Sequence, residues 1–385
     1  MRIDAPWLQR AGTRAVMAAL NTDGHRAFFV GGCVRNTLLG HAVTDIDIAT
    51  DAEPDVATAL AQAAGLRVVP TGVDHGTVTV LSDGPHEVTT FRQDVTTDGR
   101  RATVAYSKAI GEDAARRDFT MNALYADADG QVIDPLGGLA DARARRVRFI
   151  GTPAARIAED ALRVLRFFRF FAIYGDVTAG PDPEGLAACA AAVGSLDGLS
   201  RERVGAEVRK LLAADDPAPA VAAMAASGVL AAILPGADPG ALAPLVHLEK
   251  GVAGPAWVRR LAVLGSEDWR DALRLSRAEA RYLEEVRDGL RSPSLSAVAQ
   301  AFGPRIATDV ALLRAASLGQ SLPDGWNEDI ARGAKAAFPV TAADLIKRYG
   351  EGPELGAALR DLRKSWIDSD FRLDRAALLA IDSDG

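Results

Sequence analysis

The change in sequence character near residue 150 constrains the fold of this chain more than any other feature. Residues 27–149 alternate short β-rich runs, such as 77–81, with helical stretches such as 55–64, which is the pattern of a domain built from both strands and helices. From about residue 153 onward, Ala, Leu, Arg and Glu dominate and apolar residues recur at helical spacing. The predicted fold class is therefore α+β, with a mixed-sheet head followed by an all-helical remainder.

Two tight turns are predicted within the head. Asp83-Gly84 and Asp129-Gly130 each separate two β-rich runs, and this dipeptide tolerates the positive φ angles of hairpin turns. The head should therefore contain two β-hairpins at these positions.

The composition excludes several classes of protein. Apolar residues make up 48% of the chain and charged residues 25%, as in ordinary globular proteins. No stretch approaches the roughly 18 apolar residues of a membrane helix, and the N-terminus lacks the apolar core of a secretory signal, so we expect a cytoplasmic protein with no membrane partner. Cys33 and Cys189 are too few for a disulfide framework or a four-ligand structural zinc site.

Positive charge is concentrated in one segment of an acidic chain. The net charge is -7, yet residues 141–169 hold eight arginines against three acidic residues. A basic stripe of this kind can bind a phosphate backbone through counterion release. The alternative is a solvated helix face with many salt bridges, and the charge count leaves both open.

A glycine pair follows the first predicted strand. The run 30–40 is interpreted as a strand, a turn at Gly31-Gly32 and a short helix. Glycines before a helix let backbone N–H groups approach a phosphate closely, and Arg35 adds a guanidinium within the same turn. The alternative is an ordinary tight turn.

Two aspartates then occur at strand spacing. Because side chains alternate along a strand, Asp45 and Asp47 share one face while Ile46 and Ile48 point into the core. Two carboxylates this close repel each other unless a cation lies between them. Oxygen ligands of this kind suit Mg²⁺, which can activate a hydroxyl for phosphoryl displacement. A polar edge strand is the alternative, and Glu87, at the start of another predicted strand, is either a third acid of the site or a surface glutamate.

The run 116–124 carries further candidate residues. Arg116 and Arg117 can clamp a triphosphate. Asp118 and Asn122 are four residues apart, on one side of a helical turn, and can bind ribose hydroxyls. Such contacts would favour ribonucleotides. The alternative is a surface Arg–Asp pair with an asparagine at a helix end.

The run 159–169 is predicted to form one helix with Asp160 and Arg163 as i, i+3 neighbours. A carboxylate accepts a hydrogen bond from an exocyclic amino group, and a guanidinium donates to a ring nitrogen. Cytosine and adenine present this pattern, whereas uracil and guanine have a carbonyl in place of the amino group, so the pair can select C and A. Arg166 and Arg169 continue the spacing and can reach the triphosphate. A plain i, i+3 salt bridge is the alternative.

These four runs, in this order, resemble the class II tRNA nucleotidyltransferase and poly(A) polymerase family, and most closely its bacterial CCA-adding members. The matching runs span about residues 27–171. The resemblance implies a nucleotidyltransferase-type head at 1–150, a helical neck that binds nucleotide and tRNA at 151–235, and a helical body and tail at 236–385.

The resemblance also implies roles for the candidate residues. Asp45 and Asp47 would hold the catalytic Mg²⁺ ions. Asp118 and Asn122 would recognise ribose. Asp160 and Arg163 would form an amino-acid template for CTP and ATP. The implied activity is template-independent addition of C, C and A to the 3′ end of a tRNA held by its acceptor arm, with release of pyrophosphate.

Several alternatives within and beyond the family stay open. Asn36 stands where the family usually has aspartate. Some relatives add only CC or only A, others are poly(A) polymerases, and a non-catalytic RNA-binding relative is a further alternative. The run 91–101 looks like the flexible loop that full CCA addition requires, and 73–78 lacks the basic segment usual in poly(A) polymerases, which favours tRNA repair. No His-Asp dipeptide marks an appended phosphohydrolase domain, and the oligomeric state stays open.

Overall fold

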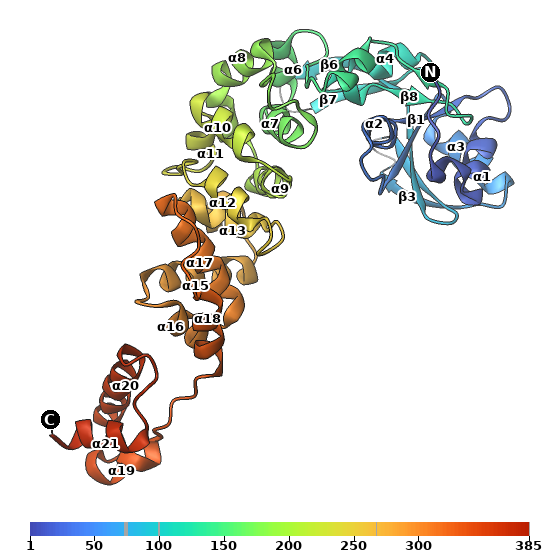
Figure 1. Cartoon of the computed structure of the whole chain (residues 1–385). Coiled ribbons are helices and arrows are strands. Elements are labelled where there is room, and N and C mark those ends of the chain that lie inside the picture. Colours follow the sequence, from blue (N-terminus) through green and yellow to red (C-terminus); the bar gives the residue numbers. More distant parts are fainter. Residues whose placement is uncertain (73–75, 99–100, 267, 385) are drawn as a thin grey trace. The chain divides into compact units, whose positions relative to one another are not determined.

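The computed structural model describes residues 1–72, 76–98, 101–266 and 268–384. The chain divides into two compact units, unit 1 at 1–233 and unit 2 at 234–385 (Figure 1). The three-part division at residues 150 and 235 stays a prediction. Residues 73–75 of the run compared with poly(A) polymerases, and 99–100 of the predicted loop, lie outside the described residues. Within the described ranges, no helix is both long and apolar enough to cross a membrane.

Unit 1 contains a mixed sheet followed by helices, which confirms the predicted fold class. Among the described residues the sheet has seven strands in the order β3-β4-β5-β2-β1-β8-β9. β2 and β5 run parallel, and the other neighbours are antiparallel. The strands are β1 (Ala27–Val30), β2 (Ile46–Thr50), β3 (Arg67–Gly72), β4 (Thr77–Leu81), β5 (Pro85–Thr90), β8 (Tyr125–Ala126) and β9 (Val132–Ile133).

Both predicted hairpins are confirmed. The chain turns between β4 and β5 at residues 82–84 and between β8 and β9 at 127–131. Gly130 has a φ of 80°, a conformation that suits glycine in a tight turn. Sequence chemistry that is local to a turn is therefore sufficient to predict both.

Most of the run 91–101, predicted to be a flexible loop, lies in a β-strand of a two-stranded ribbon. β6 (Arg92–Asp98) and β7 (Arg101–Tyr106) form a separate two-stranded antiparallel sheet. The run is rich in threonine and valine, and β-branched residues favour extended backbone.

The helices of unit 1 surround the sheet and continue beyond it. They are α1 (Ala11–Leu20), α2 (Gly32–Leu39), α3 (Pro54–Ala63), α4 (Ile110–Ala115), α5 (Gly138–Arg143), α6 (Pro153–Glu159), α7 (Leu162–Tyr174), α8 (Pro183–Ala191), α9 (Arg201–Leu212), α10 (Ala218–Ala226) and α11 (Val229–Ile233), with 3₁₀ turns η1 (Pro6–Gln9), η3 (Thr120–Asn122) and η4 (Val193–Gly198).

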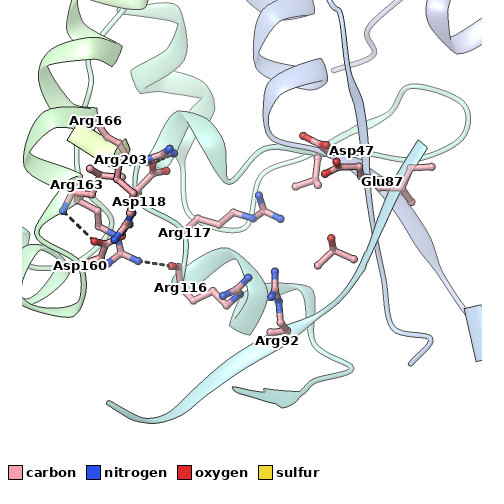
Figure 2. A pocket seen from close by; sticks show the side chains of 14 residues that line it. Asp47, Glu87, Arg92, Arg116, Arg117, Asp118, Asp160, Arg163, Arg166 and Arg203 are labelled. Atoms are coloured by element: carbon pink, nitrogen blue, oxygen red, sulfur yellow. Dashed lines mark hydrogen bonds and ion pairs between the residues drawn. The ribbon is translucent and has the colours of Figure 1, made fainter. Parts of the chain in front are cut away.

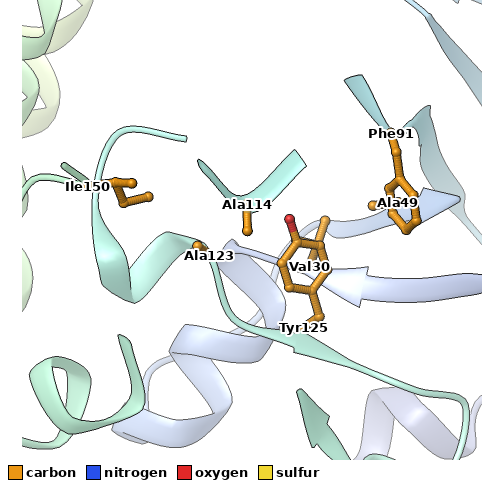
Figure 3. Close-up of a cluster of buried hydrophobic side chains, with 7 residues drawn as sticks. All are labelled: Val30, Ala49, Phe91, Ala114, Ala123, Tyr125 and Ile150. Atoms are coloured by element: carbon orange, nitrogen blue, oxygen red, sulfur yellow. The ribbon is translucent and has the colours of Figure 1, made fainter. Parts of the chain in front are cut away.

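One core cluster joins the strands to the turns that carry candidate site residues (Figure 3). Its buried members come from β1, β2, α4, β8, the segments between them and the segment before α6: Val30, Ala49, Phe91, Ala114, Ala123, Tyr125 and Ile150. Full burial of a large apolar side chain contributes roughly 1.5–3 kcal/mol. The cluster therefore holds β2, α4 and the 116–124 run in one rigid body.

The prediction of a single helix over residues 159–169 is wrong. α6 ends at Glu159, Asp160 has an extended backbone (φ -153°, ψ 105°), and α7 begins at Leu162. An oxygen of the Asp160 carboxylate accepts the N–H of Leu162 at 3.1 Å. This local side-chain bond competes with a continuous helix, so Asp160 and Arg163 are not neighbours on one helix.

Aromatic side chains of α7 pack against Phe119 of the 116–124 run. The ring of Phe119 lies 4.9 Å from Phe149 and 4.9 Å from Phe170, and Phe149 stacks on Phe167 at 5.5 Å between centroids. Contacts of this geometry add roughly 0.5–1.5 kcal/mol each beyond area burial. They place the start of α7 beside Asp118.

All regular elements in the described residues of unit 2 are helices, as predicted for this half. Its helices are α12 (Leu242–Glu249), α13 (Trp257–Leu264), α14 (Trp269–Ala272), α15 (Arg277–Arg291), α16 (Leu295–Phe302), α17 (Pro304–Leu318), α18 (Trp326–Lys335), α19 (Ala342–Tyr349), α20 (Pro353–Asp368) and α21 (Arg375–Asp384).

A buried ion network joins four of these helices. Glu249 accepts from Arg259 at 2.7 Å and from Arg260 at 2.8 Å. Asp309 accepts from Arg259 at 2.5 Å and from the Tyr282 hydroxyl at 2.7 Å. All four charged side chains are at most 6% exposed, so α12, α13, α15 and α17 are tied together by charge as well as by apolar packing.

Candidate functional site

A pocket of about 420 Å³ in unit 1 collects most of the predicted site residues (Figure 2). Eight of them line it: Asp47, Glu87, Arg116, Arg117, Asp118, Asp160, Arg163 and Arg166. Figure 2 shows the Asp47 and Glu87 carboxylates on one side, the Asp160 group on the other, and Arg117 between them. Six predicted residues are not among those lining the pocket: Asp45, Gly31, Gly32, Arg35, Asn122 and Arg169.

The acidic side of the pocket is built by strand register. Asp47 and Glu87 are direct partners on the parallel strands β2 and β5, so their side chains leave the sheet on the same face. Ile46 and Ile48 are buried on the opposite face, as predicted. Burial raises the pKa of Asp47, and the negative charges of Glu87 and Asp45 raise it further, against the opposing effect of Arg117. A bound cation would relieve this unfavourable concentration of charge.

Asp45 lies just outside the strand and does not line the pocket, although its charge acts on Asp47. It directly precedes β2, is exposed, and accepts the Thr44 hydroxyl at 2.8 Å. In the part of the chain that the structure describes, no three His, Cys, Asp or Glu side chains are placed to hold a metal ion by themselves. The donors present therefore fit a divalent ion that takes one or two carboxylates and completes its coordination with water and substrate phosphates.

The arginines of the 116–124 run are oriented by Asp113 on α4. Its buried carboxylate accepts from Arg116 at 3.2 Å, from Arg117 at 2.9 Å and from the Tyr125 hydroxyl at 2.7 Å. Burial alone would raise the pKa of Asp113, but Arg117, Tyr125 and Arg116 outweigh burial and hold it below its ordinary value. Burial likewise disfavours the charged form of Arg117, yet Asp113 raises its pKa above the usual range. Arg117 therefore presents a permanent, fixed positive charge to the pocket.

Asp118 and Asn122 lie together, but their polar atoms are already engaged. The Asn122 amide donates to Asp118 at 2.8 Å, and Arg166 donates to the other Asp118 oxygen through Nε at 2.8 Å. Burial opposes ionisation of Asp118, but Arg166 and Asn122 more than compensate and lower its pKa. Asp118 lines the pocket and Asn122 supports it from behind.

The glycine turn and Arg35 hold elements together behind the pocket. Gly31 has a φ of 66°, which favours glycine, and its N–H donates to the Leu124 carbonyl at 3.0 Å. Arg35 is 7% exposed, donates to the Tyr174 hydroxyl at 2.7 Å and lies 4.1 Å from that ring. Asn36 accepts from Arg35 at 2.8 Å and donates to the Ala42 carbonyl at 2.8 Å. An aspartate at 36 could not make the second bond.

The far side of the pocket carries Asp160 and Arg163, each with a different partner from the one predicted. Arg163 pairs with Glu159 at 2.5 Å, and Asp160 accepts from Arg203 at 2.6 Å. Both Asp160 and Arg163 still line the same pocket. The backbone N–H of Arg163 donates to the Asp160 carbonyl at 3.0 Å, so a turn at the start of α7 keeps the two residues close although no continuous helix spans 159–169.

Sequence reasoning missed Arg92, Asp113 and Arg203. Arg92 and Arg203 line the pocket, and Asp113 orients the arginines from behind. Asp113 had a visible signal, since it lies three and four residues before the two arginines on a helical turn. Arg203 is 43 residues from Asp160 and has no local signal.

The arginine-rich segment does not form one continuous stripe. Arg163 and Arg166 line the pocket, where they form ion pairs with Glu159 and Asp118. The arginines between residues 143 and 148 are exposed, and two of them, Arg146 and Arg148, pair with Asp141. These four arginines thus make the salt bridges of the alternative interpretation, and binding of a phosphate backbone stays a prediction.

Comparison with known proteins gives the same pattern along the chain. Residues 27–148 match the family described as "Poly A polymerase head domain", and residues 181–240 match "Probable RNA and SrmB- binding site of polymerase A". The CCA-adding enzyme of Levilactobacillus brevis is 33% identical over 96% of this chain and 97% of its own length. The mitochondrial CCA tRNA nucleotidyltransferase 1 of Mus musculus is 30% identical over 99% of this chain and 92% of its own.

A solved structure has the same fold. The crystal structure of the Bacillus stearothermophilus CCA-adding enzyme in complex with CTP is 29% identical, with a TM-score of 0.75 over 99% of this chain and 98% of that one. Likeness of sequence and structure thus extends over nearly the whole length. The chain belongs to the tRNA nucleotidyltransferase and poly(A) polymerase family, among its CCA-adding enzymes.

Proposed function

We propose that this protein adds C, C and A to the 3′ end of tRNA, using CTP and ATP and no nucleic-acid template. One observation carries the proposal: a single pocket holds the Asp47–Glu87 carboxylates on one side and Asp160 with Arg163 on the other, with Arg117 between them (Figure 2). That arrangement offers a metal and phosphate end and a base-reading end. The relatives above are named for the same activity.

The acidic side is the proposed catalytic end. Enzymes of this family use divalent metals, and we propose that Asp45 and Asp47 hold Mg²⁺, with Glu87 beside them. Bound there, the ion supplies activation of the attacking 3′-hydroxyl and stabilisation of charge at the α-phosphate. The protein's own part is to hold the carboxylates on one face through the β2–β5 register.

The arginines between the two ends are the proposed phosphate clamp. Arg116 and Arg117 are oriented by Asp113, and a fixed guanidinium can bind phosphate oxygens bidentately without first losing its own freedom. Arg166 reaches the pocket as well and shares Asp118 with the proposed ribose contact. The remaining members of the proposed nucleotide site act from behind its surface: Gly31, Gly32, Arg35, Asn122 and Arg169.

The base-reading end is proposed to select C and A. The Asp160 carboxylate accepts from an exocyclic amino group, and Arg163 donates to the adjacent ring nitrogen. Each good bidentate contact of this kind is worth roughly 1–3 kcal/mol of discrimination. Replacement of Asp160 by alanine should therefore relax selection against UTP and GTP.

Incorporation of labelled nucleotides into truncated tRNAs tests the function. The wild-type protein should extend a tRNA that lacks its terminus by three nucleotides with CTP plus ATP. Long products with ATP alone would instead indicate a poly(A) polymerase, and products that stop after CC or that need a preformed CC end would indicate a partial enzyme. Absence of Mg²⁺-dependent pyrophosphate release would leave only an RNA-binding role.

The metal assignment has its own test. Asp45→Ala and Asp47→Ala should each abolish incorporation while the affinity for tRNA, measured by filter binding, is retained. Incorporation at the wild-type rate in either variant would contradict the proposed metal ligands.

A further inference from the structure

The base-reading side of the pocket receives one residue from a separate part of the chain. Arg203, on α9, donates to a carboxylate oxygen of Asp160 at 2.6 Å. α9 lies inside the segment 181–240 that matches an RNA-binding family, whereas Asp160 lies in the break between α6 and α7. Two elements remote in sequence thus meet at the carboxylate proposed to read the base.

The Asp160 carboxylate is held by two bonds from two directions. One oxygen accepts the N–H of Leu162 at 3.1 Å, and the other accepts Arg203. Each carboxylate oxygen has two acceptor positions, so each can still accept one further donor. Because Asp160 has extended backbone outside both helices, these two bonds fix the plane of the carboxylate that an incoming base would meet.

Arg203 is itself held in place by the way α9 packs. One turn further along α9, Glu207 accepts from Arg169 of α7 at 2.5 Å, and both side chains are nearly buried. Val204 and Val208 are buried on the same helix. Residues i and i+4 share one side of a helix, so the Glu207–Arg169 pair sets the position of α9 from which Arg203 reaches Asp160.

We propose that Arg203 is a positioning residue for base selection: it fixes the Asp160 carboxylate so that the amino group of C or A is accepted and the carbonyl of U or G is rejected. The proposal rests on the proposed function. An ion pair with side chains that are 50% and 34% exposed contributes little to folding. The effect of losing Arg203 is therefore expected in nucleotide choice rather than in stability.

The experiment measures kcat/KM for CTP, UTP, ATP and GTP on truncated tRNAs. Arg203→Ala should lower the CTP:UTP and ATP:GTP ratios by about tenfold, within the range for one bidentate contact. Arg203→Lys, which keeps a charge but not the planar fork, should recover part of the loss. Arg201→Ala is the matched control, because Arg201 is an exposed arginine at the start of the same helix, and it should leave both ratios unchanged.

Asp160→Ala separates failure of this proposal from failure of the proposed function. If Asp160→Ala relaxes selection but Arg203→Ala leaves both ratios unchanged, or lowers kcat/KM for all four nucleotides by one factor, the role given to Arg203 is overturned and the function stands. If Asp160→Ala keeps full selection, the template assignment fails and the role of Arg203 fails with it. If the wild-type protein incorporates no nucleotide, the proposed function itself is overturned.

Discussion

The same three residue types meet at two buried places in this molecule. In unit 1, Asp113 accepts hydrogen bonds from Arg117 at 2.9 Å and from Tyr125 at 2.7 Å. In unit 2, Asp309 accepts from Arg259 at 2.5 Å and from Tyr282 at 2.7 Å. The local chemistry is nearly identical, but the surroundings differ.

The difference lies in how the positive charge is balanced. In unit 2, Glu249 is a second acid beside Asp309, and the Arg259 side chain is 6% exposed. In unit 1, the single carboxylate of Asp113 pairs with both Arg116 and Arg117. The Arg117 side chain lines the pocket and is 22% exposed. A balanced network stabilises helix packing, whereas an unbalanced one leaves positive charge directed into the pocket.

Breaking the balanced network should have the largest effect. Glu249→Gln removes the carboxylate shared by two buried arginines, so we expect the free energy of unfolding of unit 2 to fall by about 3 kcal/mol or more. Urea unfolding followed by tryptophan fluorescence measures this, since four of the five tryptophans lie in unit 2.

Glu285→Gln is the matched control for that measurement. It removes the partner of Arg281 in an i, i+4 pair at the surface, and exposed helix pairs contribute about 0.3–0.5 kcal/mol. A change below about 1 kcal/mol in Glu249→Gln would show that the buried network adds little to stability.

Breaking the unbalanced network should affect turnover. Asp113→Asn leaves Arg116 and Arg117 without their charged anchor, and misplacement of catalytic contacts by about 1 Å can cost about a hundredfold in rate. We expect a loss of this size in kcat for CTP incorporation. Asp309→Asn should lower stability but leave kcat of the folded protein unchanged, and equal losses of kcat in both variants would refute the distinction between the two networks.

The tyrosines provide a finer comparison of the two networks. Tyr125→Phe and Tyr282→Phe each delete one buried hydrogen bond to a carboxylate, at a cost of about 1.5 kcal/mol of unfolding free energy. Arg117 also donates to the Tyr125 hydroxyl at 3.1 Å, so only Tyr125→Phe should raise the KM for CTP as well. Steady-state kinetics on both variants decide between this expectation and a purely structural role for Tyr125.

The smallest expected effect is the contribution of one buried thiol, Cys189, to the response of unit 1 to alkaline pH. Burial raises the pKa of the Cys189 thiol from 9.0 to about 12, so the unfolded chain loses this proton first and stability falls as pH rises from 9 towards 12. At pH 10 the loss from this thiol should be about 1.4 kcal/mol, and Cys33, whose pKa burial also raises from 9.0 to about 12, should add a similar loss. Unit 2 contains no cysteine, and Cys189→Ala should have a shallower decline of unit 1 stability between pH 9 and 11 than wild type.

Local sequence chemistry was sufficient for part of the site. The two Asp-Gly hairpins and the arginine run depend on neighbours within a few residues, and the structure has both hairpins and places Arg116 and Arg117 in the pocket. Of the Asp-Ile-Asp run, Asp47 lines the pocket, whereas Asp45 lies outside β2 and outside the pocket lining. The placement of Asp47 and the hairpins could be predicted because side chains alternate along a strand and because Asp-Gly favours the backbone angles of a tight turn.

The rest of the site depends on contacts between distant segments. Arg35 is buried against Tyr174, 139 residues away, and spacing alone gave no reason to exclude it from the pocket. The break at Asp160 was missed because apolar residues keep helical spacing on both sides of it, although aspartate before an apolar run is a known start signal for a helix.

The parallel register of β2 and β5 has a consequence for changes in chain length. Glu87 lies beside Asp47 because the turn at 82–84 joins β4 to β5 with its present number of residues. One inserted residue that slipped β5 by a single position would turn Glu87 towards the core and bring His86, now buried, to the pocket side. The length of a short surface turn therefore determines which side chain accompanies the aspartate, and on the role proposed for Glu87 we expect a deletion or duplication there to lower nucleotide incorporation.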